Sequence, residues 1–300
     1  MTMQWKGVMP AITTGFKEDL GIDHDFFGRH CEWLLESGCT GIVTPGSLGE
    51  GATLTFDEKV ALWRTSVTAV GNKVPVIAAI SALSTADGVA QAKAAEKAGC
   101  RGLMVLPPYV YRGDWREMKA HVTAIMSATD LSCMLYNNPI AYGTDFLPTQ
   151  IAELAEERKN FQAVKESSAD IRRVTAIRTL LGNRLDILVG VDDMIVEAIV
   201  AGATGWIAGL VNALPRESVA VFDLASEGDM KGAWEIYRWF LPLLRMDTTV
   251  DFVQLIKLVQ QEVGMGSARV RPPRLELSGK YLDETLAIIR GSLKNRPAMA

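Results

Sequence analysis

The chain has 300 residues, of which 48% are hydrophobic and 22% are charged, and its formal net charge is −4. This is the composition of an ordinary globular protein, and its mild negative charge gives no reason to expect binding to nucleic acid or to an anionic membrane. No apolar run is long enough to span a bilayer, and the first ten residues lack the apolar core of a signal peptide.

The four cysteines, Cys31, Cys39, Cys100 and Cys133, form no CxxC pair and fall within apolar helix or strand patterns. Such cysteines are typical of reduced thiols in the core of a cytoplasmic protein. The three histidines do not have the spacing of a metal-ligand motif. We therefore expect a cytoplasmic location and no metal site.

The first half of the chain alternates short apolar runs with amphipathic segments. Thr55 and Glu58 form a capping-box pattern, Asp114 is a candidate N-cap, and Gly38 is a candidate C-cap. These signals predict strands at residues 7–14, 41–46, 74–80 and 102–107, and helices at residues 23–38, 55–69, 84–99 and 114–129.

The second half repeats this alternation. It predicts strands at residues 132–137, 161–165, 185–190 and 205–209, and helices at residues 147–158, 170–181, 194–202 and 215–227. The apolar strands are nearly continuous, as in a parallel sheet that helices cover on both faces. Eight β–α units match a (β/α)8 TIM barrel, which typically takes about 250 residues. A doubly wound open sheet is the competing topology, but no GxGxxG follows the first strand.

Three further helices are predicted beyond the barrel, at residues 230–245, 252–263 and 277–293. We expect residues 1–228 to form the barrel and residues 229–300 to form a C-terminal helical extension packed on it. Trp234, Tyr237, Trp239 and Phe240 crowd the first of these helices. They fit either core packing or a subunit contact, because aromatic residues are enriched at interfaces.

Lys165 stands at the end of the sixth predicted strand, directly before Glu166 and Ser167. Burying an ammonium group is costly unless it is paired or neutralised, and desolvation favours a neutral amine that can attack a carbonyl or imine carbon. The alternative is a lysine whose head group reaches solvent at the strand end.

Other polar or glycine-rich positions also follow predicted strands. Gly46, Ser47 and Leu48 open a turn whose backbone N–H groups suit a carboxylate, although a tight turn alone looks similar. Tyr136 ends the fifth strand as a proton shuttle or a packed aromatic, and Gly209 ends the eighth. Barrel active sites lie at the C-terminal ends of the strands. The combination therefore suits Schiff-base chemistry on a 2-oxo acid or a cyclic imino acid.

The motifs GSLGE at 46–50, YNNP at 136–139, VKES at 164–167 and GVDD at 190–193 resemble one known superfamily. It is the dihydrodipicolinate synthase / N-acetylneuraminate lyase superfamily of class I aldolase-type barrels, and the resemblance covers nearly the whole chain. It implies that Lys165 forms the Schiff base, that Tyr136 relays protons, and that Ser47 and Leu48 bind the substrate carboxylate through backbone N–H groups. It also implies a homotetramer without an organic cofactor.

Three positions depart from the dihydrodipicolinate synthase pattern. Leu48 replaces a hydroxyl residue of the family turn, and Val110 stands where a second tyrosine is usual. Ala141 stands where an arginine holds the carboxylate of the second substrate. These departures argue against condensation with aspartate semialdehyde.

Residues 137–145, 164–174 and 188–193 are similar to those of Δ1-pyrroline-4-hydroxy-2-carboxylate deaminases of bacterial hydroxyproline breakdown. The implied reaction releases ammonia and 2-oxoglutarate semialdehyde. Asn137, Asn138 and Tyr142 are expected to supply polar contacts to the substrate. The alternatives are a 2-keto-3-deoxy sugar-acid dehydratase or aldolase, and a dihydrodipicolinate synthase-like condensation. A non-enzymatic barrel that binds small acids as a regulator is the alternative from a different class.

Overall fold

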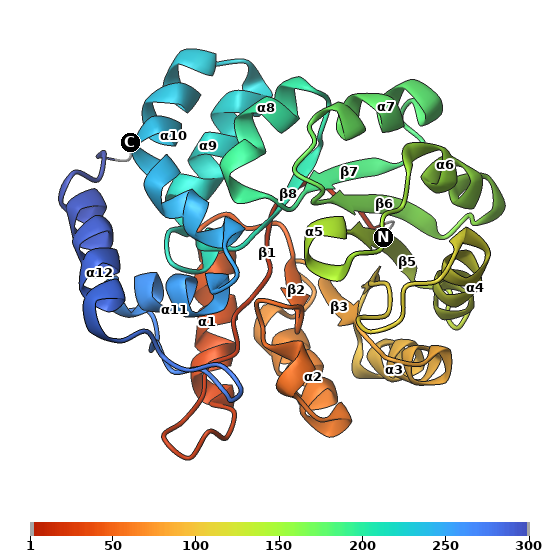
Figure 1. Cartoon of the computed structure of the whole chain (residues 1–300), viewed down its shortest axis with the longest axis horizontal. Coiled ribbons are helices and arrows are strands. Elements are labelled where there is room, and N and C mark those ends of the chain that lie inside the picture. Colours follow the sequence, from red (N-terminus) through yellow and green to blue (C-terminus); the bar gives the residue numbers. More distant parts are fainter. Residues whose placement is uncertain (1–2, 299–300) are drawn as a thin grey trace.

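The eight strands form one parallel sheet that curls into a barrel, as the computed structural model of residues 3–298 shows (Figure 1). Each strand pairs with its neighbours in chain order, and β8 pairs with β1. The ring closes through a parallel bridge between Ala11 and Val43. The strands are β1 (Gly7–Pro10), β2 (Ile42–Thr44), β3 (Val76–Ile80), β4 (Gly102–Val105), β5 (Ser132–Asn137), β6 (Phe161–Glu166), β7 (Asp186–Val189) and β8 (Gly205–Ala208). The predicted (β/α)8 barrel is confirmed.

The helices that follow the strands begin at the caps expected from the sequence. Thr55 and Glu58 exchange both hydrogen bonds of a capping box, and Asp114 forms another with Glu117. The surrounding helices are α1 (His24–Glu36), α2 (Phe56–Val70), α3 (Thr85–Ala98), α4 (Trp115–Met126), α6 (Pro148–Glu157), α7 (Arg172–Leu181), α8 (Ile195–Val200) and α9 (Pro215–Glu227).

Short helical turns that the sequence analysis did not predict occupy several loops on the side where the strands end. They follow β2, β5, β7 and β8, and a further one follows the helix α10 (Met230–Leu244). They are η1 (Gly51–Thr53), α5 (Pro139–Tyr142), η2 (Asp192–Met194), η3 (Leu210–Asn212) and η4 (Arg245–Thr248). Because these turns sit at the strand ends, they shape the mouth of the barrel.

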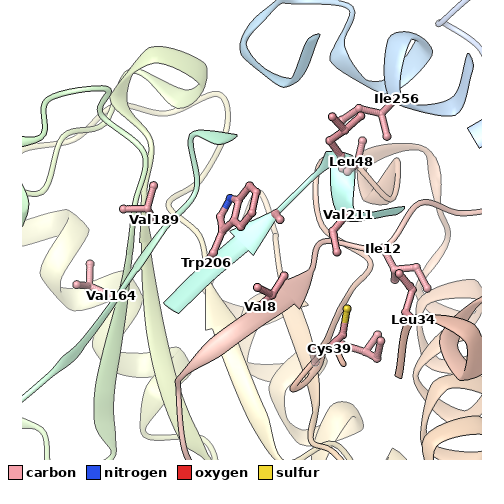
Figure 2. Packing of buried hydrophobic residues seen from close by; sticks show 14 of the residues in the cluster. Val8, Ile12, Leu34, Cys39, Leu48, Val164, Val189, Trp206, Val211 and Ile256 are labelled. Atoms are coloured by element: carbon pink, nitrogen blue, oxygen red, sulfur yellow. The ribbon is translucent and has the colours of Figure 1, made fainter. Parts of the chain in front are cut away.

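Two apolar layers explain why the strands read as nearly continuous apolar runs. Met9, Met104 and Leu188 belong to a cluster formed mainly by strand residues. Val8, Trp206 and many helix residues form the larger second cluster, part of which Figure 2 shows. The alternate residues of each strand are therefore buried on both faces of the sheet, as parallel strands covered by helices require.

The C-terminal helices α10, α11 (Phe252–Glu262) and α12 (Gly279–Lys294) lie together on one side of the barrel, near α1, α8 and α9 (Figure 1). Helix α10 packs against α9, and its Tyr237 and Phe240 are fully buried. Trp234 and Trp239 are partly buried against the same cluster. The aromatic crowding on this helix therefore serves core packing, while the division at residue 228 stays a prediction.

All four cysteines are buried and free of disulfides, and burial raises the pKa of each thiol to about 12. Thiols in this state behave as small apolar residues, as the sequence analysis expected. Among residues 3–298, no helix is long and apolar enough to cross a membrane.

Candidate active site

A pocket of about 600 Å³ opens at the C-terminal ends of the strands. Seven of the residues predicted from the sequence line it: Gly46, Ser47, Leu48, Tyr136, Asn138, Lys165 and Gly209. These residues come from the ends of β2, β5, β6 and β8, which lie far apart in the chain. The barrel therefore brings together the groups that the sequence analysis singled out.

Lys165 lies near the end of β6, and its side chain is only 6% exposed. The ladder between β5 and β6 sets it beside Tyr136, and its Nζ lies 4.1 Å from the centre of the Tyr136 ring. Gly190 makes room for it, because a Cβ at this position would lie 2.1 Å from Lys165 Cε. The amine is thus desolvated against an aromatic face and confined to the pocket.

Tyr136 and Tyr142 place two phenol groups in the pocket. Asn138 Nδ2 donates to Tyr136 Oη at 3.0 Å, and the two tyrosine rings meet edge to face with centroids 5.6 Å apart. Tyr142 Oη is hydrogen-bonded to Ser47 Oγ. Burial, and then the neighbouring Tyr136, raises the pKa of Tyr142 well above its ordinary value. Tyr142 is therefore a neutral phenol that can donate or accept a hydrogen bond.

The helical turn α5 explains how Tyr142 reaches the pocket. Asn138 Oδ1 accepts from Ala141 N at 3.0 Å as the N-cap of α5, and Pro139 occupies its first turn. The preceding Asn137 is fully buried, and it accepts from Phe146 N and donates to Glu166 Oε2. Asn137 therefore braces β6 from outside the pocket, so the expectation that it contacts the substrate is wrong.

The turn after β2 presents free backbone donors. Within residues 3–298, the amides of Ser47 and Leu48 have no backbone acceptor, and Gly51 N donates to Gly46 O at 3.0 Å to close the turn. Glu50 has a positive φ of 56° and directs its carboxylate away, onto Lys257. Two unpaired N–H groups in a concave turn suit a carboxylate ligand.

Asp192 fixes the opposite wall, where β7 and β8 end. Its carboxylate accepts from Trp206 Nε1 at 2.9 Å, from Gly209 N at 3.1 Å and from Leu210 N at 2.8 Å. Burial raises the pKa of this fully buried carboxyl to about 6, although the N–H donors lower it. Asp192 therefore holds the backbone at Gly209 in place rather than contacting a ligand.

Several polar residues of the pocket were not predicted from the sequence, among them Ser167, Asp247 and Arg274. Ser167 Oγ is buried and has no partner in the described part of the chain, and its place two residues after Lys165 could have revealed it. Asp247 and Arg274 come from the C-terminal region, where no strand end marks them. Val110, which stands where the family usually has a second tyrosine, is 82% exposed and does not line the pocket.

Together these groups provide a buried amine, two phenols, an anion-binding turn and carboxyl groups. Within residues 3–298, no three His, Cys, Asp or Glu side chains gather as a metal site would require. An amine beside a proton relay and a carboxylate anchor can form a Schiff base with a 2-oxo acid and remove a proton from the adjacent carbon.

Known proteins resemble this chain in sequence and in architecture. Residues 4–291 match the model of the dihydrodipicolinate synthetase family. A 4-hydroxy-tetrahydrodipicolinate synthase of Moorella thermoacetica is 32% identical over 96% of this chain and 98% of its own.

Solved structures agree with this match. A dihydrodipicolinate synthase of Bacillus anthracis superposes with a TM-score of 0.92 at 26% identity, covering 99% of this chain and 100% of its own. One from Acinetobacter baumannii, complexed with pyruvate, superposes with a TM-score of 0.91 at 26% identity over 97% and 99% of the two chains. The family model spans nearly the whole chain and includes every residue of the pocket, so the chain belongs to the dihydrodipicolinate synthetase family.

Proposed function

We propose that the protein is a Schiff-base-forming lyase that deaminates Δ1-pyrroline-4-hydroxy-2-carboxylate to 2-oxoglutarate semialdehyde and ammonia. One observation carries the choice of substrate. Ala141 lines the pocket where the family resemblance expects an arginine for a second carboxylate, and the phenol of Tyr142 stands next to it. A small ring with one carboxylate needs one anchor, which the Ser47–Leu48 turn supplies, and its single hydroxyl needs few polar partners.

In this reaction the amine of Lys165 attacks C2 of the cyclic imine, the ring opens, and an iminium to the lysine remains. The iminium is an electron sink that acidifies the C3–H bond, and Tyr136 or a water removes that proton. The 4-hydroxyl group then leaves. Tautomerisation gives an imine at C5, and water hydrolyses it to an aldehyde and ammonia. Hydrolysis of the bond to Lys165 releases the product.

A second candidate is the condensation of pyruvate with aspartate semialdehyde. The curated relatives carry the name 4-hydroxy-tetrahydrodipicolinate synthase, and Arg274 at the pocket provides a cation that could hold a second carboxylate. Sugar-acid dehydratases and aldolases use the same Schiff-base chemistry. The apolar side chain of Leu48 in the turn disfavours a polyhydroxylated acid, because each buried hydroxyl requires a partner.

The decisive experiment compares kcat/KM for the pyrroline with kcat/KM for 2-keto-3-deoxygluconate, for 2-keto-3-deoxyarabonate, and for pyruvate with aspartate semialdehyde. Lys165→Met serves as the inactive control for each substrate. We expect the pyrroline to be the best substrate, with release of ammonia and aldehyde. A rival that turns over at least tenfold better, about 1.4 kcal/mol in transition-state binding, would overturn the deaminase assignment.

We also propose that the chain assembles as a homotetramer in the cytoplasm. Val110 and Tyr111 in the loop after β4, and Ile140 in α5, expose apolar surface, which supports a contact between copies. Light scattering at micromolar concentration tests this, and a monomer would contradict it.

A further inference from the structure

Asp247 brings a carboxyl group from the C-terminal region to the reactive amine. It belongs to η4, which packs against η2 after β7. Its Oδ1 would lie 2.2 Å from a Cβ at position 209, so only a glycine there lets the carboxyl reach the end of β8. Asp247 lines the same pocket as Lys165, and the charge on Lys165 acts on its carboxyl.

The position of this carboxyl complements that of the phenols. Strand β6, with Lys165, lies between β5, which carries Tyr136, and β7 and β8, whose ends carry Asp192 and Gly209. The phenols therefore reach the pocket beside the end of β5, and Asp247 reaches it beside the end of β8. A substrate bound to Lys165 would therefore have phenol groups toward β5 and the carboxyl group of Asp247 toward β8.

Two carboxyl groups, Asp192 and Asp247, reach the end of β8 in different surroundings, and only Asp247 lines the pocket. Asp192 is held by three different N–H donors, which stabilise its ionised form. Asp247 receives no hydrogen bond within residues 3–298, and burial and then the charge of Asp192 raise its pKa well above its ordinary value. Asp192 accepts from Gly209 N, and Asp247 Oδ1 would lie 2.2 Å from a Cβ at the same glycine, so their like charges repel each other and favour a proton on Asp247.

We infer that Asp247 is the catalytic acid that protonates the oxygen leaving from C4 of the lysine-bound substrate. This inference rests on the proposed Schiff-base elimination and adds a residue to it. Neither the amine nor the Ser47–Leu48 turn can supply that proton, because the first is bound to the substrate and the second holds its carboxylate.

The proton transfer balances without any further reactant. After the C3 proton has left, the enamine electron pair forms the C3–C4 double bond and the C4–O bond breaks. The carboxylic proton of Asp247 passes to the departing oxygen, so water leaves rather than hydroxide. Asp247 remains as a carboxylate and regains a proton from solvent through the open pocket.

The test uses Asp247→Asn, which keeps the shape of the side chain but carries no acidic proton. Asp251→Asn is the matched control, because it removes a carboxylate four residues further along, outside the pocket lining. The first readout is deuterium exchange at C3 of pyruvate in D₂O, which needs Lys165 and the base but no leaving group. The second is turnover of the pyrroline and of its 4-fluoro analogue, since fluoride leaves without a proton.

We expect Asp247→Asn to exchange deuterium into pyruvate at close to the wild-type rate, and to lose roughly 10²–10⁴-fold in turnover of the hydroxylated pyrroline. The loss should largely vanish with the fluorinated analogue, and the control should match the wild type throughout. An equal loss with both leaving groups, or loss of deuterium exchange, would show that Asp247 only maintains the site and would overturn the inference.

These measurements distinguish a wrong substrate assignment from a wrong role for Asp247. If the wild type does not turn over the pyrroline but dehydrates 2-keto-3-deoxygluconate, the substrate assignment is wrong. The same selective loss in Asp247→Asn with that substrate would still support the acid. If the wild type catalyses only the condensation with aspartate semialdehyde, no C4 hydroxyl leaves and the inference is wrong as well.

Discussion

Lys257 of α11 donates a hydrogen bond to Glu50 at 2.6 Å, and both side chains are almost completely buried. Glu50 belongs to the turn after β2 that carries Ser47 and Leu48, and its second oxygen accepts from Arg271 N at 2.9 Å. These contacts of Glu50 thus hold the C-terminal region against the anion-binding turn. Removing one partner from a buried pair is costly, because the other charge remains in an apolar environment.

Lys257→Met should therefore lower the free energy of unfolding by about 3–5 kcal/mol. Urea unfolding measures this. Lys280→Met is the control, because its pair with Glu284 is exposed and worth about 0–1 kcal/mol. The double variant Glu50→Gln with Lys257→Met should recover part of the loss, and equal losses in the single and double variants would contradict the buried-charge explanation.

Lys165 should be the residue that forms the covalent adduct with a 2-oxo acid. Reduction with borohydride in the presence of pyruvate should fix a mass adduct on the peptide that contains Lys165. Lys59 is the internal control, because it is also buried but donates to the carbonyl oxygen of Ser81 and lies outside the pocket. An adduct on Lys59, or none at saturating pyruvate, would rule out the Schiff-base mechanism.

Tyr136→Phe should lower kcat by roughly 10²–10⁴-fold, because it removes a proton relay that lies beside the amine. The affinity for pyruvate, measured by isothermal titration calorimetry, should change far less than kcat. Tyr111→Phe removes a phenol that is exposed and bonded to Glu117, and it should leave kcat unchanged. A kcat of Tyr136→Phe close to that of the wild type would show that Tyr136 has only a packing role.

Gly190→Ala tests how the pocket accommodates the reactive lysine. The added Cβ would lie 2.1 Å from Lys165 Cε and 2.2 Å from Ser167 Oγ, so the amine must move. We expect a large loss of the borohydride-trapped adduct while the circular dichroism spectrum stays that of the wild type. Gly291→Ala, whose Cβ meets no atom within 4 Å, is the control. Normal trapping in Gly190→Ala would show that Lys165 has space to adjust.

The barrel could be predicted because its signals are local. Strand residues are buried on both faces, and caps such as Thr55 mark where helices begin. The strand ends then identify Lys165 and Tyr136, because a barrel places all of them at one mouth. These predictions needed the order of the elements but no details of their packing.

Asp247 could not be predicted and Tyr142 only in part, for different reasons. Asp247 reaches the pocket because η4 packs against η2, a contact between segments that no periodicity reveals. Tyr142 was expected as a polar contact, but its bond to Ser47 depends on the short helix α5. The sequence Asn138-Pro139 is a helix-start signal that would have predicted this turn.

His30 should make the stability of the fold depend on pH between about 4 and 6.5. The side chain is fully buried, and its Nε2–H donates to the carbonyl oxygen of Asn212 at 3.0 Å. Burial lowers the pKa of His30 to about 4, against a smaller opposing effect of that hydrogen bond. Between these two pH values the unfolded chain binds more protons than the folded one, so the free energy of unfolding falls as the pH is lowered.

The change attributable to His30 should be roughly 3 kcal/mol over this interval, because one pKa unit corresponds to about 1.36 kcal/mol. Urea unfolding from pH 4 to pH 7 should therefore give a shallower pH dependence for His30→Gln than for the wild type, whatever its absolute stability. His24→Gln is the control, since His24 is only half-buried and bonds to the hydroxyl of Thr65. Parallel pH profiles for His30→Gln and the wild type would mean that His30 is already accessible to protons in the folded protein.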